Sequence, residues 1–86
     1  MFDKTSLYDL NDIHDALISK TIIEVYEALE EKGYNSKSQL VGYLISGDPG
    51  YITSYKNARN KITEYDRAKI LEVILKDYID KNIWNT

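Results

Sequence analysis

One stretch in the middle of the chain constrains the fold more than any other, because it holds all four glycines and the only proline. A residue without Cβ enters the left-handed conformation cheaply, so the first and third glycines are suited to end helices. An asparagine and an Asp-Pro pair follow them, and these residue types begin helices or helical turns. The residues predicted to make these turns are Gly33, Asn35, Gly47, Asp48 and Pro49.

Apolar residues recur at three- and four-residue steps on both sides of these turns, which indicates helices. We expect a first helix that is capped by Asn11 or Asp12 and runs to about Lys32, and a last helix that restarts after a cap at 63–66 and runs to about Lys81. Between them we expect a helix over 36–46, a short helical turn, and a helix from about 54 to 62. No segment is convincing as a strand, so the fold class is all-α, a compact bundle of about four to five helices.

The helix over 36–46 supports three finer predictions. Ser36 and Gln39 have the spacing of a capping box. The apolar residues after them leave almost no polar side, so we expect this helix to be buried nearly all round. Gly42 in its middle costs about 1 kcal/mol relative to alanine. We therefore expect another backbone to approach closely there.

Size and termini define the domain organisation. We expect residues 1–10 to form a flexible arm, 11–82 a single helical domain, and 83–86 a frayed end. Among the 86 residues there is no cysteine, and the start of the chain has neither the basic residues nor the apolar run of a signal peptide. No apolar run approaches the ~20 residues of a membrane span. We expect a cytoplasmic protein.

The last helix is more apolar than one buried stripe requires. Seven of the ten residues from 70 to 79 are apolar. Two explanations stand side by side: this is the central helix of the core, or its surplus face packs against a second copy of the chain. A domain this small buries only about 60–65% of its unfolded surface, so a second subunit would stabilise it. The residues alone leave both explanations open.

Positive charge is concentrated in one window of an acidic chain. The formal net charge is −3, yet residues 54–69 carry +3, so the remaining residues carry −6. This pattern favours one anionic partner group over a polyanion such as a nucleic acid. The residues Lys56, Arg59, Thr63 and Arg67 would form a stripe if one helix ran through them all, but a break at Thr63 is more consistent with the cap signal there. The alternative is a solvated face, or arginines that tether the acidic first helix.

The chain lacks the residue sets of common catalytic and metal sites. Its only histidine, His14, has no cysteine or second histidine to share a metal, and it is better explained as a surface residue. There is no nucleophile with a base and an orienting group, and no glycine-rich phosphate loop. We therefore predict no catalytic activity, no metal and no cofactor. Thr5 and Ser6 lie near acidic residues on the arm, where a kinase could reach a hydroxyl and add about −1.5 to −2 charges.

The central stretch also resembles a known family. The segments Val25–Asn35, Gln39–Tyr51 and Asn57–Arg59, with their Gly-Tyr-Asn and Ser-Gly-Asp-Pro blocks, are similar to the IreB/ReoM family of small regulatory phosphoproteins of Gram-positive bacteria. The likeness extends from about Ile22 to Tyr78. The arm is similar in layout to the family's phosphorylated segment, with Thr5 at the position of the phosphoacceptor.

The resemblance implies an all-helical homodimer without catalytic activity. It implies phosphorylation by a membrane Ser/Thr kinase with extracellular PASTA domains, and reversal by a partner phosphatase. It further implies an influence on peptidoglycan synthesis and on resistance to cell-wall antibiotics. At least part of the family acts by promoting Clp-protease turnover of the first committed peptidoglycan enzyme, and phosphorylation relieves this effect.

The cationic window departs from the family pattern. Relatives often carry arginines where this chain has Ser54 and Thr63, whereas Arg59 and Arg67 remain. Lys56 can supply charge but not the planar, bidentate geometry of a guanidinium. From the sequence we assign Lys56, Arg59 and Arg67 to partner or anion binding.

Two other functions remain as alternatives. The second and third helices, with a turn between them, superficially resemble a DNA-binding helix-turn-helix. The net negative charge and the apolar second helix speak against that function, and no nucleic-acid partner is expected. The third candidate is a purely structural subunit of a larger assembly, in which Thr5 would stay unmodified.

Overall fold

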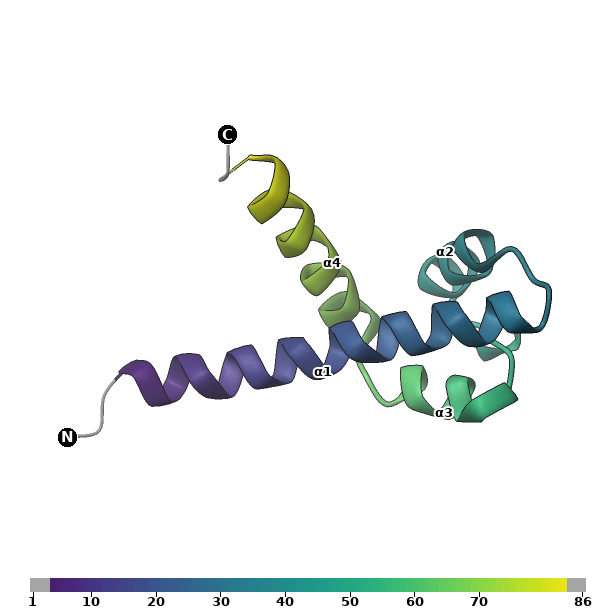
Figure 1. Ribbon diagram of the computed structural model, residues 1–86, viewed down its shortest axis with the longest axis horizontal. Coiled ribbons are helices and arrows are strands. Elements are labelled where there is room, and N and C mark those ends of the chain that lie inside the picture. Colours follow the sequence, from purple (N-terminus) through teal and green to yellow (C-terminus); the bar gives the residue numbers. More distant parts are fainter. Residues whose placement is uncertain (1–3, 84–86) are drawn as a thin grey trace.

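The computed structural model describes residues 4–83, and over this range it confirms the all-α prediction (Figure 1). The described part contains four α-helices and two 3-10 turns. Their bounds are α1 Lys4–Glu31, α2 Ser36–Ser46, η1 Pro49–Tyr51, η2 Tyr55–Asn57, α3 Ala58–Thr63 and α4 Arg67–Asn82. The two turns lie where one short helical turn and the start of the third helix were expected.

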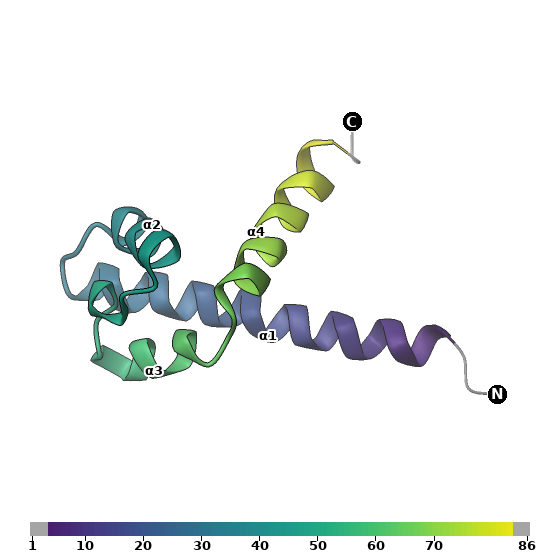
Figure 2. The same cartoon turned by 180° about the vertical axis from the view of Figure 1, so that it is seen from behind.

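Helix α1 is the axis on which the other helices pack. α2 and α3 lie against its C-terminal half, and α4 crosses it near the middle and then diverges, so that α4 and the N-terminal part of α1 form an open V (Figures 1 and 2). The core lies where α1 meets these elements and contains no charged side chain. Its buried hydrophobic residues are Ile18, Val25, Ala28, Leu29, Tyr43, Ile52, Ala58, Ile62, Ile70 and Val73.

The first helix begins earlier than the sequence indicated. α1 starts at Lys4, so the cap predicted at Asn11 or Asp12 is wrong. No glycine or proline interrupts residues 4–12, and extending a formed helix by one residue costs far less than nucleating one. The flexibility of residues 1–10 stays a prediction, and residues 1–3 and 84–86 lie outside the described residues.

The turn residues behave as predicted. Gly33 and Gly47 have φ of 82° and 77°, in the left-handed region. Asn35 caps α2, because its Oδ1 accepts a hydrogen bond from the amide of Ser38 at 3.0 Å. Asp48 caps η1 through a 2.8 Å bond that its Oδ1 accepts from the amide of Gly50. Two reversals thus return the chain onto α1.

The finer predictions for α2 are wrong. Ser36 makes no capping box with Gln39: the Ser36 hydroxyl is buried and donates to the carbonyl oxygen of Tyr26 at 2.9 Å. The helix is not buried all round either, since Val41 is 48% exposed and Ile45 is 79% exposed. A single chain of this size offers too few elements to cover both sides of α2.

The break predicted at Thr63 is confirmed, and α4 restarts at Arg67. Within α4 only Ile70 and Val73 are buried, so α4 is not the central helix of the core. The surplus apolar residues of this helix are exposed by 40–61%: Leu71, Ile74, Leu75 and Tyr78.

Candidate functional site

Lys56, the first of the predicted binding cations, is held by an ionic clasp at the C-terminal end of α1. Its Nζ lies 3.0 Å from Oε2 of Glu31, and the hydroxyl of Tyr55 donates to the other carboxylate oxygen at 3.0 Å. The ammonium groups of Lys32 and Lys56 lie 5.1 and 5.5 Å from the centre of the Tyr55 ring, within the range of cation–π attraction. We call these four side chains the Glu31 clasp.

The clasp changes the acid–base chemistry of its members. The hydrogen bond from Lys56, followed by that from Tyr55, lowers the pKa of Glu31 below its usual range. The same hydrogen bond to Glu31, with the Coulombic attraction of that carboxylate, raises the pKa of Lys56. Because the pKa of Glu31 is lowered and that of Lys56 is raised, both groups are charged at neutral pH. Both are solvent-exposed, so salt screens the attraction between them.

Arg59 is fixed by the backbone of the turn that precedes it. Its Nε donates to the carbonyl oxygen of Ile52 at 2.8 Å and to that of Pro49 at 3.1 Å. Through these two bonds the start of α3 is tied to η1. The Nε–H group of the guanidinium is therefore used in hydrogen bonds to the backbone. Its two terminal nitrogens have no partner among residues 4–83.

Arg67 is bound to the end of α2. Its Nη1 donates to the carbonyl oxygen of Leu44 at 3.0 Å, and its guanidinium lies against Gly47. A Cβ atom at Gly47 would come within 2.7 Å of the Arg67 Cζ. Arg67 thus satisfies a carbonyl at a helix C-terminus, where orphan acceptors and the negative end of the dipole favour a cation.

The three predicted binding cations do not converge on one point. Lys56 pairs with α1, Arg59 with the η1 turn and Arg67 with the end of α2. The acidic first helix is tethered by lysines, because Lys61 lies 3.4 Å from Glu24 and Lys69 lies 3.5 Å from Asp15. The arginines donate to backbone carbonyls instead. Much of the local positive charge is therefore neutralised within the chain.

The expected phosphoacceptor lies at the opposite end of α1 from the Glu31 clasp, which holds Lys56. The backbone of Thr5 belongs to the first turn of α1, and Glu31 is the last residue of that helix. At 1.5 Å per residue the two are ~39 Å apart along the axis. Ser6 follows Thr5 in the same turn.

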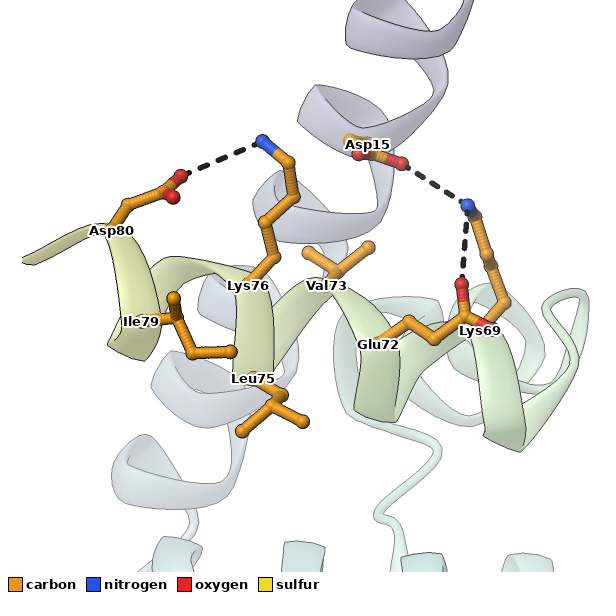
Figure 3. A pocket seen from close by; sticks show the side chains of 8 residues that line it. All are labelled: Asp15, Lys69, Glu72, Val73, Leu75, Lys76, Ile79 and Asp80. Carbon is orange, nitrogen blue, oxygen red and sulfur yellow. Dashed lines mark ion pairs between the residues drawn. The ribbon is translucent and has the colours of Figure 1, made fainter. Parts of the chain in front are cut away.

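A groove lies in the V between α1 and α4, and its volume is about 440 Å³ (Figure 3). Asp15 of α1 faces Lys69 across it, and Lys69 also lies 3.7 Å from Glu72. The Asp15–Lys69 contact is an ion pair without hydrogen-bond geometry. The remaining lining residues are Val73, Leu75, Lys76, Ile79 and Asp80. Paired charges and apolar side chains both line the groove.

Sequence reasoning missed two packing relationships elsewhere in the fold. The close neighbour of Gly42 is the ring of Tyr51, not a backbone. His14 packs edge-on against Tyr65 with ring centroids 5.9 Å apart, and its side chain is exposed. Each contact joins residues of two different segments, and no local sequence pattern predicts such a pair.

The link between α2 and α3 differs from that of a DNA-binding helix-turn-helix. That motif joins its helices by a turn of about three to four residues. Here residues 47–57 intervene with both 3-10 turns, and α3 spans only Ala58–Thr63 and buries Ala58 and Ile62. The resemblance to a helix-turn-helix is therefore superficial.

Fold and surface together define a class: a small all-helical protein whose exposed apolar and charged faces are suited to contacts with other proteins. No helix within residues 4–83 has the length and apolar character needed to cross a lipid bilayer. The family model for the IreB regulatory phosphoproteins matches residues 3–80. The chain therefore belongs to the IreB regulatory phosphoprotein family, and its role is that of a regulatory phosphoprotein.

Proposed function

We propose that the protein is a cytoplasmic substrate of a membrane Ser/Thr kinase with PASTA domains, and that Thr5 is the phosphoacceptor. The observation that carries this proposal is the family match, which extends from residue 3 to residue 80 and so includes Thr5. A cognate phosphatase reverses the modification. The protein has no catalytic activity of its own and needs no cofactor; it acts by binding.

The regulated process in this proposal is peptidoglycan synthesis, and with it resistance to cell-wall antibiotics. The unmodified protein promotes Clp-protease turnover of the first committed peptidoglycan enzyme, and phosphorylation relieves this turnover. Membership of the IreB family supports a regulatory phosphoprotein role. The pathway itself is suggested by the resemblance of the central stretch to that family.

A homodimer is part of the same proposal. The exposed apolar residues of α4 support it, since a contiguous apolar face on a small soluble protein commonly marks an interface. A second copy would also compensate for the small core of one chain. Sedimentation equilibrium tests this point, and a mass of 10.0 kDa at micromolar concentration would contradict it.

The position of Thr5 favours one route for the switch. A phosphate on Thr5 cannot reach Arg59 of its own chain without unwinding much of α1, because that helix is continuous from Lys4 to Glu31. The route that we propose is a direct effect of the added negative charge on a partner protein that contacts the N-terminal part of α1. Repulsion of an acidic partner is the simplest such effect.

Phosphorylation in vitro tests the acceptor. The protein is incubated with the kinase domain and ATP, and the modified residues are mapped by mass spectrometry. We expect a single phosphate on Thr5, loss of modification in Thr5→Ala, and retention in Ser6→Ala. Modification confined to residues outside the first turn of α1 would contradict the proposal.

Partner capture tests the regulation. Wild-type, Thr5→Ala and kinase-phosphorylated proteins serve as bait in a lysate. We expect the unmodified and Thr5→Ala proteins to retain the Clp machinery or its peptidoglycan-enzyme substrate, and the phosphorylated protein to release it. Equal retention by all three would remove phosphorylation as the switch.

A further inference from the structure

A polar recess lies at the junction of η2 and α3, on the side of Arg59. It is lined by Ser54, Asn57, Arg59 and Asn60 and has a volume of about 260 Å³. Asn60 donates from Nδ2 to Oδ1 of Asn57 at 2.8 Å, so the acceptor that Asn57 offers is already used. The hydroxyl of Ser54 makes no capping bond.

The recess therefore has an excess of hydrogen-bond donors. The Nε of Arg59 is fixed by the carbonyls of Pro49 and Ile52, which sets the orientation of the guanidinium plane. Its terminal nitrogens carry four N–H groups without an acceptor in the described part of the chain. A guanidinium held in one orientation loses little entropy when it binds, which is the condition for a bidentate contact with an anion.

The backbone that forms the recess is strained. Lys56 and Asn57 are consecutive non-glycine residues with φ of 52° and 62°. This conformation costs about 1–2 kcal/mol at Lys56 and less at Asn57, because asparagine adopts it more readily, and it persists where the surroundings enforce it. The Glu31 clasp supplies that enforcement from the preceding side. Strain of this kind is concentrated at binding sites, and here it positions Asn57 in the wall of the recess.

The other two predicted cations are not available in the same way. Lys56 is paired with Glu31, and Arg67 is committed to Leu44 and packed on Gly47. Arg59 is distinguished by an orientation that two hydrogen bonds fix and by the adjacent polar hollow. The recess thus offers one unpaired formal positive charge, which matches a carboxylate better than the dianion of a phosphate ester.

We infer that this recess binds a carboxylate side chain of an acidic segment in the regulated protein partner. The inference rests on the proposed regulatory function and assigns the contact chemistry of its partner surface. Phosphate on Thr5 would oppose such a partner only where the partner also places acidic residues beside the first turn of α1, because charges farther apart than about 10 Å are screened by salt.

Titration with two small anions and a peptide tests the inference on the full chain. Nuclear magnetic resonance follows the Arg59 Nε–H signal and the amides of residues 54–60 in ¹⁵N-labelled protein. The ligands are acetate, inorganic phosphate and a short Asp-rich peptide, each at constant ionic strength maintained with chloride. We expect saturating shifts at these residues with acetate, and saturation at about tenfold lower concentration with the peptide, which presents several carboxylates.

Three variants separate the recess from general charge effects. Ser54→Ala keeps both structural bonds of Arg59 and removes one donor, and we expect it to weaken peptide binding several-fold, in line with one lost hydrogen bond. Arg59→Lys should weaken it about tenfold or more, because an ammonium cannot bind in bidentate fashion. Arg67→Lys makes the same charge-conserving substitution away from the recess and should bind as the wild type does. Circular dichroism confirms the helical content of each variant.

Several results would overturn the inference. These are shifts that grow linearly with every anion and spread over the surface, equal weakening by Arg59→Lys and Arg67→Lys, or saturation by phosphate at lower concentration than by acetate. The kinase assay on Thr5 does not depend on any of them, so failure of the recess and failure of the proposed function are distinguishable.

Discussion

The ring of Tyr51 lies directly against Gly42, so that a Cβ atom built on Gly42 would come within 2.5 Å of the ring carbon Cε1. Tyr51 belongs to η1 and Gly42 to the middle of α2, and the contact fixes the angle at which the chain returns after Gly47. The amide of Gln39 reinforces it by donating to the carbonyl oxygen of Tyr51 at 3.0 Å.

This contact predicts that the effect of Gly42→Ala changes sign with its neighbour. Alanine in a helix interior gains about 1 kcal/mol over glycine. Displacing the Tyr51 ring costs about 1–3 kcal/mol, so we expect net destabilisation in the wild type. In a Tyr51→Ala background the clash is absent, and the same change should stabilise by about 1 kcal/mol. Urea unfolding of the four proteins measures both effects. Stabilisation by Gly42→Ala with Tyr51 present would contradict the packing.

The two left-handed glycines offer a matched pair. Nothing lies within 4 Å of a Cβ at Gly33, so Gly33→Ala should cost only the conformational term of about 1–2 kcal/mol. Gly47→Ala should cost about 1 kcal/mol more, because it also displaces Arg67 from its bond to Leu44. Thermal unfolding compares the two variants. In an Arg67→Ala background the difference between them should disappear.

The Glu31 clasp predicts an acid-sensitive part of the stability. The pKa of Glu31 is lowered in the folded protein, so its contribution is present above the unfolded value of about 4.5 and is lost as pH falls through the folded pKa. Wild type and Glu31→Gln should therefore differ in urea midpoint at pH 7 and converge as the pH falls below the ordinary pKa of a glutamate and through the lowered one. The pKa of Lys56 is raised, so its contribution disappears only above the ordinary lysine value. A difference that grew on acidification would exclude the clasp.

Backbone strain at Lys56 can be separated from its ion pair. Lys56→Ala and Lys56→Gly both remove the contact with Glu31, but only glycine relieves the positive φ. We expect the glycine variant to be more stable than the alanine variant by about 1 kcal/mol. Chemical denaturation of both proteins at one pH measures the difference. Equal stability would mean that this segment adopts another conformation in solution.

Phosphorylation of Thr5 should strengthen the start of α1. The first turn of this helix carries no acidic residue, and negative charge at a helix N-terminus stabilises by about 0.3–1 kcal/mol at low salt. Amide hydrogen exchange of residues 6–9 should become slower after modification, and the gain should shrink as salt is added. Faster exchange would indicate that the phosphate opens the turn instead.

Local chemistry predicted the turns well and the distant contacts poorly. Gly33, Asn35 and Gly47 act through their own backbone and near neighbours, so their roles follow from residue type. The predicted start of α1 was too far along the chain. Asn11 and Asp12 are residue types that commonly precede a helix, and the sequence alone does not show that they lie inside one. The exposure of Ile45 could not be predicted from its apolar neighbours, since it depends on which elements pack against α2.

The candidate site shows the same division. The positive window was evident from the sequence, but which cation remains available depends on acceptors elsewhere in the chain. Lys56 forms an ion pair with Glu31, and Arg67 donates a hydrogen bond to the carbonyl oxygen of Leu44. Neither pairing follows from a spacing in the sequence. Arg59 retains unused donors only because both of its bonds leave from Nε. The assignment of Thr5 still rests on its position in the chain.

The length of α1 sets a requirement on whatever receives the signal. Where the 28-residue helix is formed throughout, its first turn and the recess beside Arg59 lie toward opposite ends of one rod. A receptor that senses both ends at once must be at least as long as this rod, or must gather the two ends from different subunits of one assembly. A small ligand with one binding site would contact only one of these two ends.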